Sequence, residues 1–353
     1  MSDNALQELL QHYMDMDASA LTLPTLIVLD ENAGELPANP FQDVLTLTNR
    51  IDVCNTLRQL QWPCEFNDFA FDSNMKAGRQ RALYRISKEK LVVEHVLQSL
   101  WHLLPVGGEL YCAGYKNEGI KTFAKRIVEA WDCAMTLERG RGNLHIYRFT
   151  KATTTTIALN ESDYHALHKI ADWQGNPVFS KPGVFAWDRL DEGSNFLLEH
   201  LPDFLHKYDH TREKALDLGC GYGLLTLALL QAGCQHVVAT DNNAAALLAC
   251  NFSLQQGSYA QQATVVAADC GDIVTDGQFD LLVCNPPFHQ GFGVEQDMTD
   301  RFLQAAKRLI NKRGRAFFVV NTFIPLERKA KTLFSEVHTV ADNRRYKLVV
   351  LQK

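Results

Sequence analysis

Lys214-Ala-Leu-Asp-Leu-Gly-Cys-Gly-Tyr-Gly223 is the stretch of sequence that decides the fold. Its first five residues, as far as Leu218, have the apolar composition of a short buried strand. Three glycines follow at alternate positions, and the next segment, Leu224 to Ala232, has helical apolar spacing. Glycine lets the backbone turn sharply and approach a ligand closely. A strand, a glycine turn and a helix in this order predict a ligand-binding loop of an α/β sheet.

Gly219, Gly221 and Gly223 alone would suit a dinucleotide, a phosphate or an adenosyl group. A dinucleotide fingerprint requires glycine at its sixth position, where this chain has Leu224. A phosphate loop ends in Gly-Lys-Ser/Thr, which the loop lacks. The residue before the loop region, Asp217, favours a ligand that carries an amino or cationic group.

Two further acidic residues follow the next two predicted strands, His236 to Thr240 and Thr264 to Ala268. Asp241 is placed where a carboxylate accepts ribose hydroxyls, and Asp269 where it can accept from an adenine amino group. Each could instead cap a helix or a turn. Three acids at successive strand ends around one glycine loop, without a phosphate-binding lysine, favour S-adenosylmethionine, which is cationic and has no phosphate.

A second motif, Asn285-Pro-Pro-Phe288, ends the apolar run Phe279 to Cys284. Proline fixes φ and has no backbone N–H, so this turn offers acceptors without competing donors. A planar amino group could donate to the Asn285 oxygen and to the Pro286 carbonyl, while Phe288 stacks on the ring that carries it. Asn-Pro-Pro is also an ordinary loop breaker. Its position some 65 residues after the glycine loop, within one α/β domain, favours the amine-binding interpretation.

The whole chain has 353 residues and predicts about two domains. The second half alternates predicted strands and helices and ends in two strands around 334–338 and 346–351, which indicates a parallel sheet with a final antiparallel pair. Residues 20–150 carry an eroded form of the same plan. We therefore predict a first domain at 1–150, a linker at 151–180 and a catalytic domain at 181–353.

Composition bounds the class of protein. Hydrophobic residues make up 46% and charged residues 22%, as in globular domains, and the net charge of −6 argues against wholesale nucleic-acid coating. The nine cysteines form no Cys-x-x-Cys pair, which speaks against a zinc or redox site and for a reducing compartment. No signal peptide or membrane-length apolar run is visible. We expect a soluble, cytoplasmic monomer without a metal.

The glycine loop, Asp241, Asp269 and Asn285-Pro-Pro-Phe288 together resemble the class I methyltransferases that modify exocyclic amines. With His289 added, and with the upstream run Lys181-Pro-Gly-Val-Phe-Ala-Trp-Asp-Arg-Leu-Asp-Glu-Gly-Ser194, the chain resembles the ribosomal RNA guanine-N2 methyltransferases of the small-subunit (RsmC) type. The chain departs from that family at Ala186-Trp187, where Ser-Arg is common.

The resemblance implies an α/β fold of two tandem Rossmann-like class I methyltransferase domains, of which the first is degenerate. It implies methylation of a guanine N2 amine in 16S ribosomal RNA with S-adenosylmethionine as cofactor, and the ribosomal RNA or small ribosomal subunit as partner. The catalytic residues would be Asn285, Pro286 and Phe288. The cofactor-binding residues would be Asp217, Gly219, Gly221, Gly223, Asp241, Asp269 and Asn285.

Other acceptors remain open at the level of sequence. The related large-subunit (RlmG) type shares the Asn-Pro-Pro-Phe-His-Gln run, so a guanine of 23S ribosomal RNA is one alternative. Adenine N6 or a protein glutamine can occupy the same turn. A silent RNA-binding assembly factor is the alternative outside enzymes.

The first half lacks counterparts to both motifs. Asp30-Glu-Asn-Ala-Gly34 keeps one glycine of three, and Tyr84-Arg-Ile-Ser-Lys-Glu-Lys90 is basic where Asn-Pro-Pro-Phe would be. Local lysines and arginines are enough to attract phosphates. We therefore predict that the first domain docks RNA, through residues such as Arg85, Lys88 and Lys90, or supports its partner domain.

Overall fold

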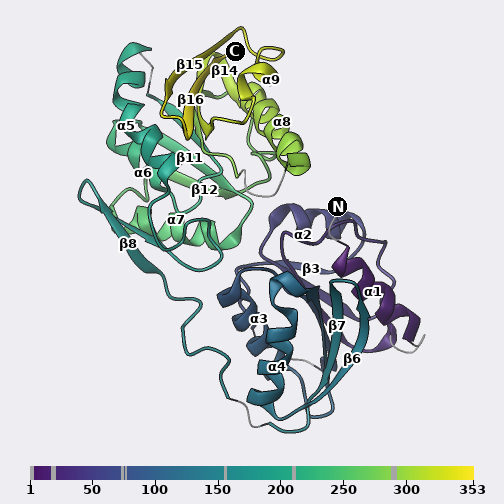
Figure 1. The fold of residues 1–353 in the computed structure, drawn as a ribbon. Helices are drawn as coiled ribbons and strands as arrows, with labels where there is room; N and C mark the ends of the chain where they lie inside the picture. Colours follow the sequence, from purple (N-terminus) through teal and green to yellow (C-terminus); the bar gives the residue numbers. More distant parts are fainter. Residues whose placement is uncertain are drawn as a thin grey trace. The chain divides into compact units, whose positions relative to one another are not determined.

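The computed structural model describes residues 4–16, 21–72, 75, 78–154, 157–208, 212–287 and 292–353. The chain forms two compact units, Met1–His165 and Ala166–Lys353 (Figure 1). The boundary between them lies inside the segment 151–180. Part of that segment, His168–Trp173 (β8) and Asn176–Ser180 (β9), is an antiparallel hairpin of the second unit.

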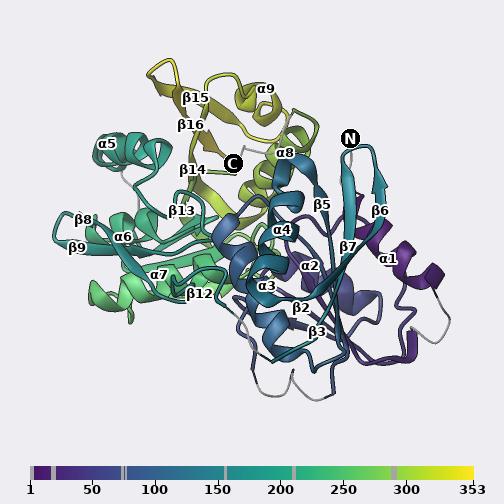
Figure 2. The ribbon, with the colours of Figure 1, turned by 60° about the horizontal axis from the view of Figure 1, so that its bottom comes forward.

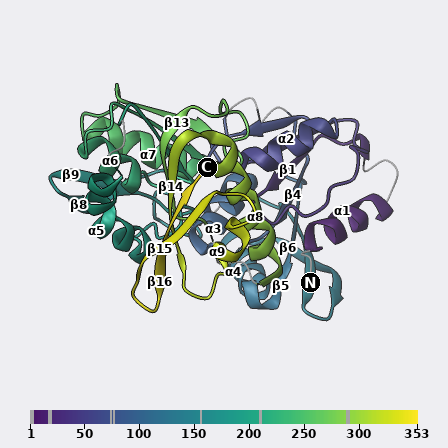
Figure 3. The same cartoon turned by 90° about the horizontal axis from the view of Figure 1, so that it is seen from above.

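The second unit is built on a seven-stranded sheet of order β12-β11-β10-β13-β14-β16-β15. Five strands are parallel, and the last two are antiparallel to their neighbours, so that β14, β15 and β16 lie side by side (Figure 3). The predicted parallel sheet with a final antiparallel pair is thus confirmed. The strands are β10 (Lys214–Leu218), β11 (His236–Asp241), β12 (Ala263–Ala267), β13 (Phe279–Cys284), β14 (Ile310–Asn321), β15 (Glu336–Asp342) and β16 (Tyr346–Gln352).

Helices cover both faces of this sheet. One face carries α5 (Glu192–Lys207), α6 (Leu224–Gln231) and α7 (Ala244–Gln256), and the other carries α8 (Phe292–Leu309) and α9 (Leu326–Ala330). The hairpin β8–β9 packs beside α7 (Figures 1 and 2), where Phe179 and Phe252 meet edge to face.

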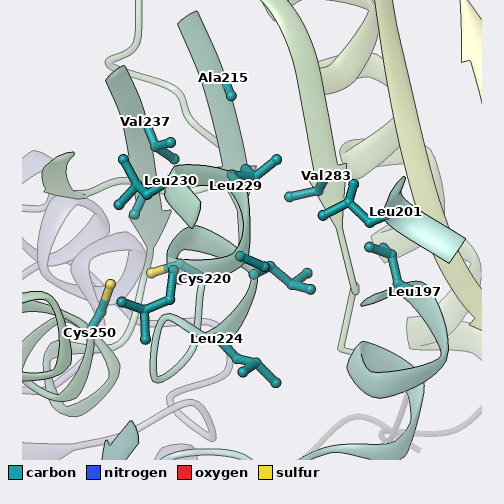
Figure 4. Close-up of a cluster of buried hydrophobic side chains, with 14 of the residues drawn as sticks. Leu197, Leu201, Ala215, Cys220, Leu224, Leu229, Leu230, Val237, Cys250 and Val283 are labelled. Atoms are coloured by element: carbon teal, nitrogen blue, oxygen red, sulfur yellow. The ribbon is translucent and has the colours of Figure 1, made fainter. Parts of the chain in front are cut away.

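The core beneath α5 and α6 fixes the strands that lead to the site (Figure 4). Leu197 and Leu201 of α5 lie against Val283 of β13, and Leu229 of α6 is fully buried near Ala215 of β10. Full burial of each leucine stabilises the fold by about 1.5–3 kcal/mol. The ends of β10 and β13 are therefore held by apolar packing on this face.

The first unit repeats the same strand order, β3-β2-β1-β4-β5-β7-β6, in a second seven-stranded sheet. Its strands are β1 (Thr25–Leu29), β2 (Val44–Thr48), β3 (Cys64–Phe66), β4 (Arg81–Arg85), β5 (Glu109–Tyr115), β6 (Ala134–Arg141) and β7 (Leu144–Thr150). Its helices are α1 (Ala5–Met16), α2 (Ile51–Gln59), α3 (Lys90–Leu103) and α4 (Ile120–Trp131), with the 3₁₀ turn η3 (Lys116–Glu118). The two-domain α/β fold predicted from the sequence is confirmed.

The first unit lacks one helix of the second. Residues 30–43, all of which the structure describes, connect β1 to β2 without a helix, whereas α6 connects β10 to β11. In the second unit the glycine loop leads into that helix. Its absence from the first unit agrees with a degenerate domain.

The basic segment of the first unit is less exposed than its sequence suggests. Arg85 is the last residue of the central strand β4, is only 2% exposed and pairs with Glu118 at 2.8 Å. This corrects the expectation that Arg85 belongs to an RNA-facing surface, because its guanidinium is held by Glu118 and lies over the Tyr115 ring. Lys88 and Lys90 are exposed.

Among the described residues, no helix is both long and apolar enough to cross a membrane. Across the same residues, no cluster of three or more histidine, cysteine or acidic side chains is arranged to hold a metal ion.

Candidate active site

The glycine loop joins β10 to α6 and is tied to the neighbouring strand. The backbone N–H groups of Gly219 and Cys220 donate to the Thr240 carbonyl at 2.8 and 2.9 Å. Gly219, Gly221 and Gly223 have φ values of 82°, 53° and 87°, a left-handed region that favours glycine. A Cβ on Gly223 would lie 2.7 Å from the Cys250 sulfur. The loop therefore depends on glycine both for its conformation and for its contact with α7.

Asp217 precedes the loop and is completely buried. Its Oδ2 accepts a 2.6 Å hydrogen bond from the Thr226 hydroxyl, whereas its Oδ1 has no hydrogen-bond partner among the described residues. Burial, with a smaller contribution from the negative charge of Asp241, raises the pKa of Asp217 to about 7. A buried carboxyl group with one oxygen that lacks a hydrogen-bond partner is suited to a cationic ligand.

Asp241 ends β11 and organises both the loop and the start of α7. Its Oδ2 accepts from the Gly221 backbone N–H, and its Oδ1 accepts from the Asn243 N–H, each at 2.9 Å. The N-cap of α7 is Asn243, whose side chain accepts from the Ala245 N–H at 3.0 Å. Asp241 is therefore not the cap of this helix. Its carboxylate lies at the edge of the glycine loop, where it binds the Gly221 backbone N–H.

Asp269 follows β12 and forms an ion pair with Arg301 of α8. Its backbone N–H donates to the Asp272 carboxylate at 3.0 Å. No local sequence pattern indicates this arginine, because 32 residues separate the two partners. Asp269 as an adenine-binding residue stays a prediction.

Asn285 follows β13, whose Val283 lies opposite Asp217 in the parallel pair with β10. Its amide nitrogen donates to Asp191 Oδ2 at 2.6 Å and to the Ser194 hydroxyl at 2.9 Å. Pro286 is buried and Pro287 is exposed. Phe288 and His289 lie outside the described residues, so the stacking role of Phe288 stays a prediction.

The predicted site residues thus share one edge of the sheet. Asp217, Asp241, Asp269 and Asn285 lie at or just beyond the carboxyl ends of four adjacent parallel strands, β10, β11, β12 and β13, together with the glycine loop. Ligands of open α/β sheets bind outside this edge.

Sequence reasoning missed several supporting residues. Asp191 caps α5, Thr226 binds the buried acid, and Tyr222 accepts from the Asp191 backbone N–H at 2.8 Å. For Asp191 a signal existed, since Leu-Asp-Glu-Gly-Ser before an apolar run is typical of a helix N-terminus. Its contact with Asn285 had none.

These residues fit S-adenosylmethionine. Gly221 faces open space, where a ligand can approach the backbone closely, the acids suit a cation, and Asp217 Oδ1 is a buried acceptor without a partner among the described residues. Fold and site define a class I S-adenosylmethionine-dependent methyltransferase.

Comparisons with known proteins narrow this class. The family profile "Methyltransferase small domain" matches residues 175–350. The chain is 33% identical to Ribosomal RNA small subunit methyltransferase C of Shewanella loihica, over 71% of this chain and 70% of that protein. It is 33% identical to the protein of the same name from Shewanella amazonensis, over 72% and 71%. The chain belongs to the ribosomal RNA small subunit methyltransferase C family.

A solved structure agrees over nearly the whole length. The T. thermophilus 16S rRNA N2 G1207 methyltransferase (RsmC), in complex with AdoMet and guanosine, superposes with a TM-score of 0.79 at 26% identity, covering 94% of this chain and 88% of that one. Both tandem units therefore have counterparts in that enzyme.

Proposed function

We propose that this chain transfers a methyl group from S-adenosylmethionine to the exocyclic N2 amine of a guanine in 16S ribosomal RNA. The observation that carries the proposal is the anchored carboxamide of Asn285, at the end of the strand that neighbours the glycine loop. The names of the relatives, and the AdoMet and guanosine of the T. thermophilus enzyme, support the choice of cofactor and acceptor.

S-Adenosylmethionine, when bound, would supply an electrophilic methyl group with a neutral thioether as its leaving group, so that N2 could act as the nucleophile. The chain has to align acceptor and donor, an effect that contributes several kcal/mol. Asn285 Oδ1 and the Pro286 carbonyl would accept the two amine hydrogens and favour positive charge on N2. The N2 proton then leaves for water, so no strong base is required.

The guanine must reach this edge of the sheet unpaired. A base inside an RNA helix is inaccessible to the site, so it comes from a single-stranded region or is extruded. Stacking on Phe288 would hold the extruded ring.

For the first unit, we propose a role in RNA docking or in support of the catalytic unit. The support is the missing helix between β1 and β2 and the exposed Lys88 and Lys90. We also propose that the protein is cytoplasmic and acts as a monomer. Light scattering on the purified protein tests the monomeric state.

Methyl transfer from labelled S-adenosylmethionine tests the function. The substrates are small subunits, free 16S RNA and 23S RNA from a strain that lacks the enzyme, and mass spectrometry maps the product. The expected product is N2-methylguanine in 16S RNA. Label in 23S RNA, in adenine or in a protein glutamine would replace the proposed acceptor. Absence of both cofactor binding and transfer would favour a silent assembly factor.

A further inference from the structure

The carboxamide of Asn285 is held by the start of α5. We propose that Asp191, assisted by Ser194, is a positioning residue that fixes the Asn285 amide so that its Oδ1 faces the acceptor amine. The inference deepens the proposed function and rests on it, because it assigns Asn285 to the methyl acceptor. Asp191 is not expected to touch the substrate.

Both hydrogens of the Asn285 NH₂ group have partners on α5. Asp191 Oδ2 accepts one at 2.6 Å, and the Ser194 hydroxyl accepts from the same nitrogen at 2.9 Å. The Asp191 oxygen also accepts from the Ser194 backbone N–H at 2.7 Å, as the N-cap of α5. The same carboxylate oxygen of Asp191 therefore caps the N-terminus of α5 and holds the side-chain amide of Asn285.

The orientation follows from the chemistry of the partners. An ionised carboxylate only accepts hydrogen bonds, so the amide must turn its NH₂ toward Asp191 and its oxygen away. In the opposite orientation, two oxygens would face each other, and the NH₂ would meet the amine of the substrate, donor against donor. A charged acceptor on the nitrogen also polarises the amide and makes Oδ1 a stronger acceptor.

The surroundings keep Asp191 at this point. Its backbone N–H donates to the hydroxyl of Tyr222, within the glycine loop, at 2.8 Å. Gly193 is buried beside it, and a Cβ there would lie 3.2 Å from Asp191 Oδ2 and 3.4 Å from Asn285 Nδ2. The start of α5 thus links the glycine loop to the acceptor motif, two parts of the site that the sequence separates by more than 60 residues.

Two substitutions of Asp191 and one control separate its hydrogen bond to Asn285 from its role as the N-cap of α5. Serine is as good an N-cap as aspartate, but its hydroxyl is too short to reach Asn285, so Asp191→Ser removes only the anchor. Asp191→Asn keeps an oxygen at the same place and caps α5 equally well, so it should retain much of the wild-type kcat. Asp188→Ser makes the same change at an exposed residue outside the site and serves as the matched control.

The experiment measures kcat with small subunits, the Kd of S-adenosylmethionine by titration calorimetry, and Tm. We expect Asp191→Ser to lower kcat about 100-fold, the size of losing one preorganised catalytic hydrogen bond. Its cofactor Kd and Tm should stay close to those of Asp188→Ser. Asp191→Asn should lie between Asp191→Ser and the wild type in kcat.

A double-mutant cycle with Asn285→Ala tests whether Asp191 acts through Asn285. In the Asn285→Ala background, Asp191→Ser should cause no further loss of kcat. Additive losses, or a normal kcat in Asp191→Ser, would overturn the positioning role. If Asp191→Ser does not fold, Ser194→Ala in the same cycle decides the question. Normal methylation by Asn285→Ala itself would instead overturn the proposed function, so the two failures are distinguishable.

Discussion

The carboxylate of Asp241 accepts a 2.9 Å hydrogen bond from the backbone N–H of Gly221, so the end of one strand fixes the loop that follows its neighbour. The other carboxylate oxygen accepts from Asn243, which caps α7 and donates to the Gly183 carbonyl at 2.7 Å. Asp241 thereby shapes the loop in addition to the ribose contact predicted for it.

The first prediction concerns this residue. Asp241→Ala removes the acceptor of two backbone N–H groups, and hydrogen bonds to charged groups are worth about 1.5–3 kcal/mol each. We expect the Kd of S-adenosylmethionine to rise at least tenfold in titration calorimetry. Asp203→Ala, on the exposed side of α5, is the control and should bind normally. An unchanged Kd in Asp241→Ala would show that the loop keeps its shape without this acceptor.

The second prediction compares two glycines of the loop. Alanine at Gly221 meets open space and costs only the left-handed conformation, roughly 1–2 kcal/mol. Alanine at Gly223 has the same strain and also clashes with Cys250, which adds about 1–3 kcal/mol. Chemical denaturation should therefore rank Gly223→Ala below Gly221→Ala in stability.

The clash itself can be isolated. The double variant Gly223→Ala with Cys250→Ala removes the sulfur that the new methyl group would meet, so it should regain part of the stability after correction for Cys250→Ala alone. Strict additivity of the two changes would mean that backbone strain, and not the sulfur contact, accounts for the loss.

Much of the fold could be predicted from the sequence, because apolar runs and glycine turns are local signals. The ends of elements were harder. The helix α8 begins at Phe292, but its first turns contain Gly293 and few apolar residues, so no apolar helical spacing marks that start in the sequence. The strand β14 begins at Ile310, but charged residues interrupt the apolar pattern of its first half, so its start is also hidden in the sequence.

The site was predictable in outline only. Strand ends placed Asp217, Asp241 and Asn285 on one edge, because parallel strands end together. The pairing of Asn285 with Asp191 depends on how α5 packs, across 94 residues, and no local pattern encodes it. Arg85 shows the opposite error, since its charge suggested a surface and the topology buries it beside Glu118.

A third prediction follows from that burial. Arg85→Ala removes the positive partner of the buried Glu118 carboxylate. Breaking a buried ion pair in this way typically costs about 3–5 kcal/mol of stability. The unfolding free energy of the first unit should fall by that order, whereas Lys88→Ala, at an exposed position, should change it little. Equal stabilities of the two variants would contradict the buried pair.

A fourth prediction tests RNA docking by the first unit. Lys88→Glu combined with Lys90→Glu reverses two exposed charges, which should weaken binding to 16S RNA and reduce the salt slope of log Kd by about 1–2. Lys121→Glu combined with Lys125→Glu makes the same charge change on exposed positions of α4 and is the control. If the Lys88/Lys90 variant binds 16S RNA as tightly as the Lys121/Lys125 control does, the docking role is refuted and the supporting role remains.

The last prediction concerns pH and Asp217, whose pKa is raised by burial from 3.8 to about 7. Because the folded state holds this proton more tightly than the unfolded state, ionisation of Asp217 opposes folding. The cost is absent below pH 3.8, grows as the pH rises toward 7, and is complete above it, at a few kcal/mol. Asp217→Asn cannot ionise and keeps an acceptor for Thr226, so its stability relative to the wild type should increase between pH 4 and pH 8. Denaturant unfolding at the two pH values measures the difference, which cancels any constant effect of the new amide. A relative stability that is equal at pH 4 and pH 8 would mean that Asp217 is ionised throughout this range or that a counter-charge compensates it.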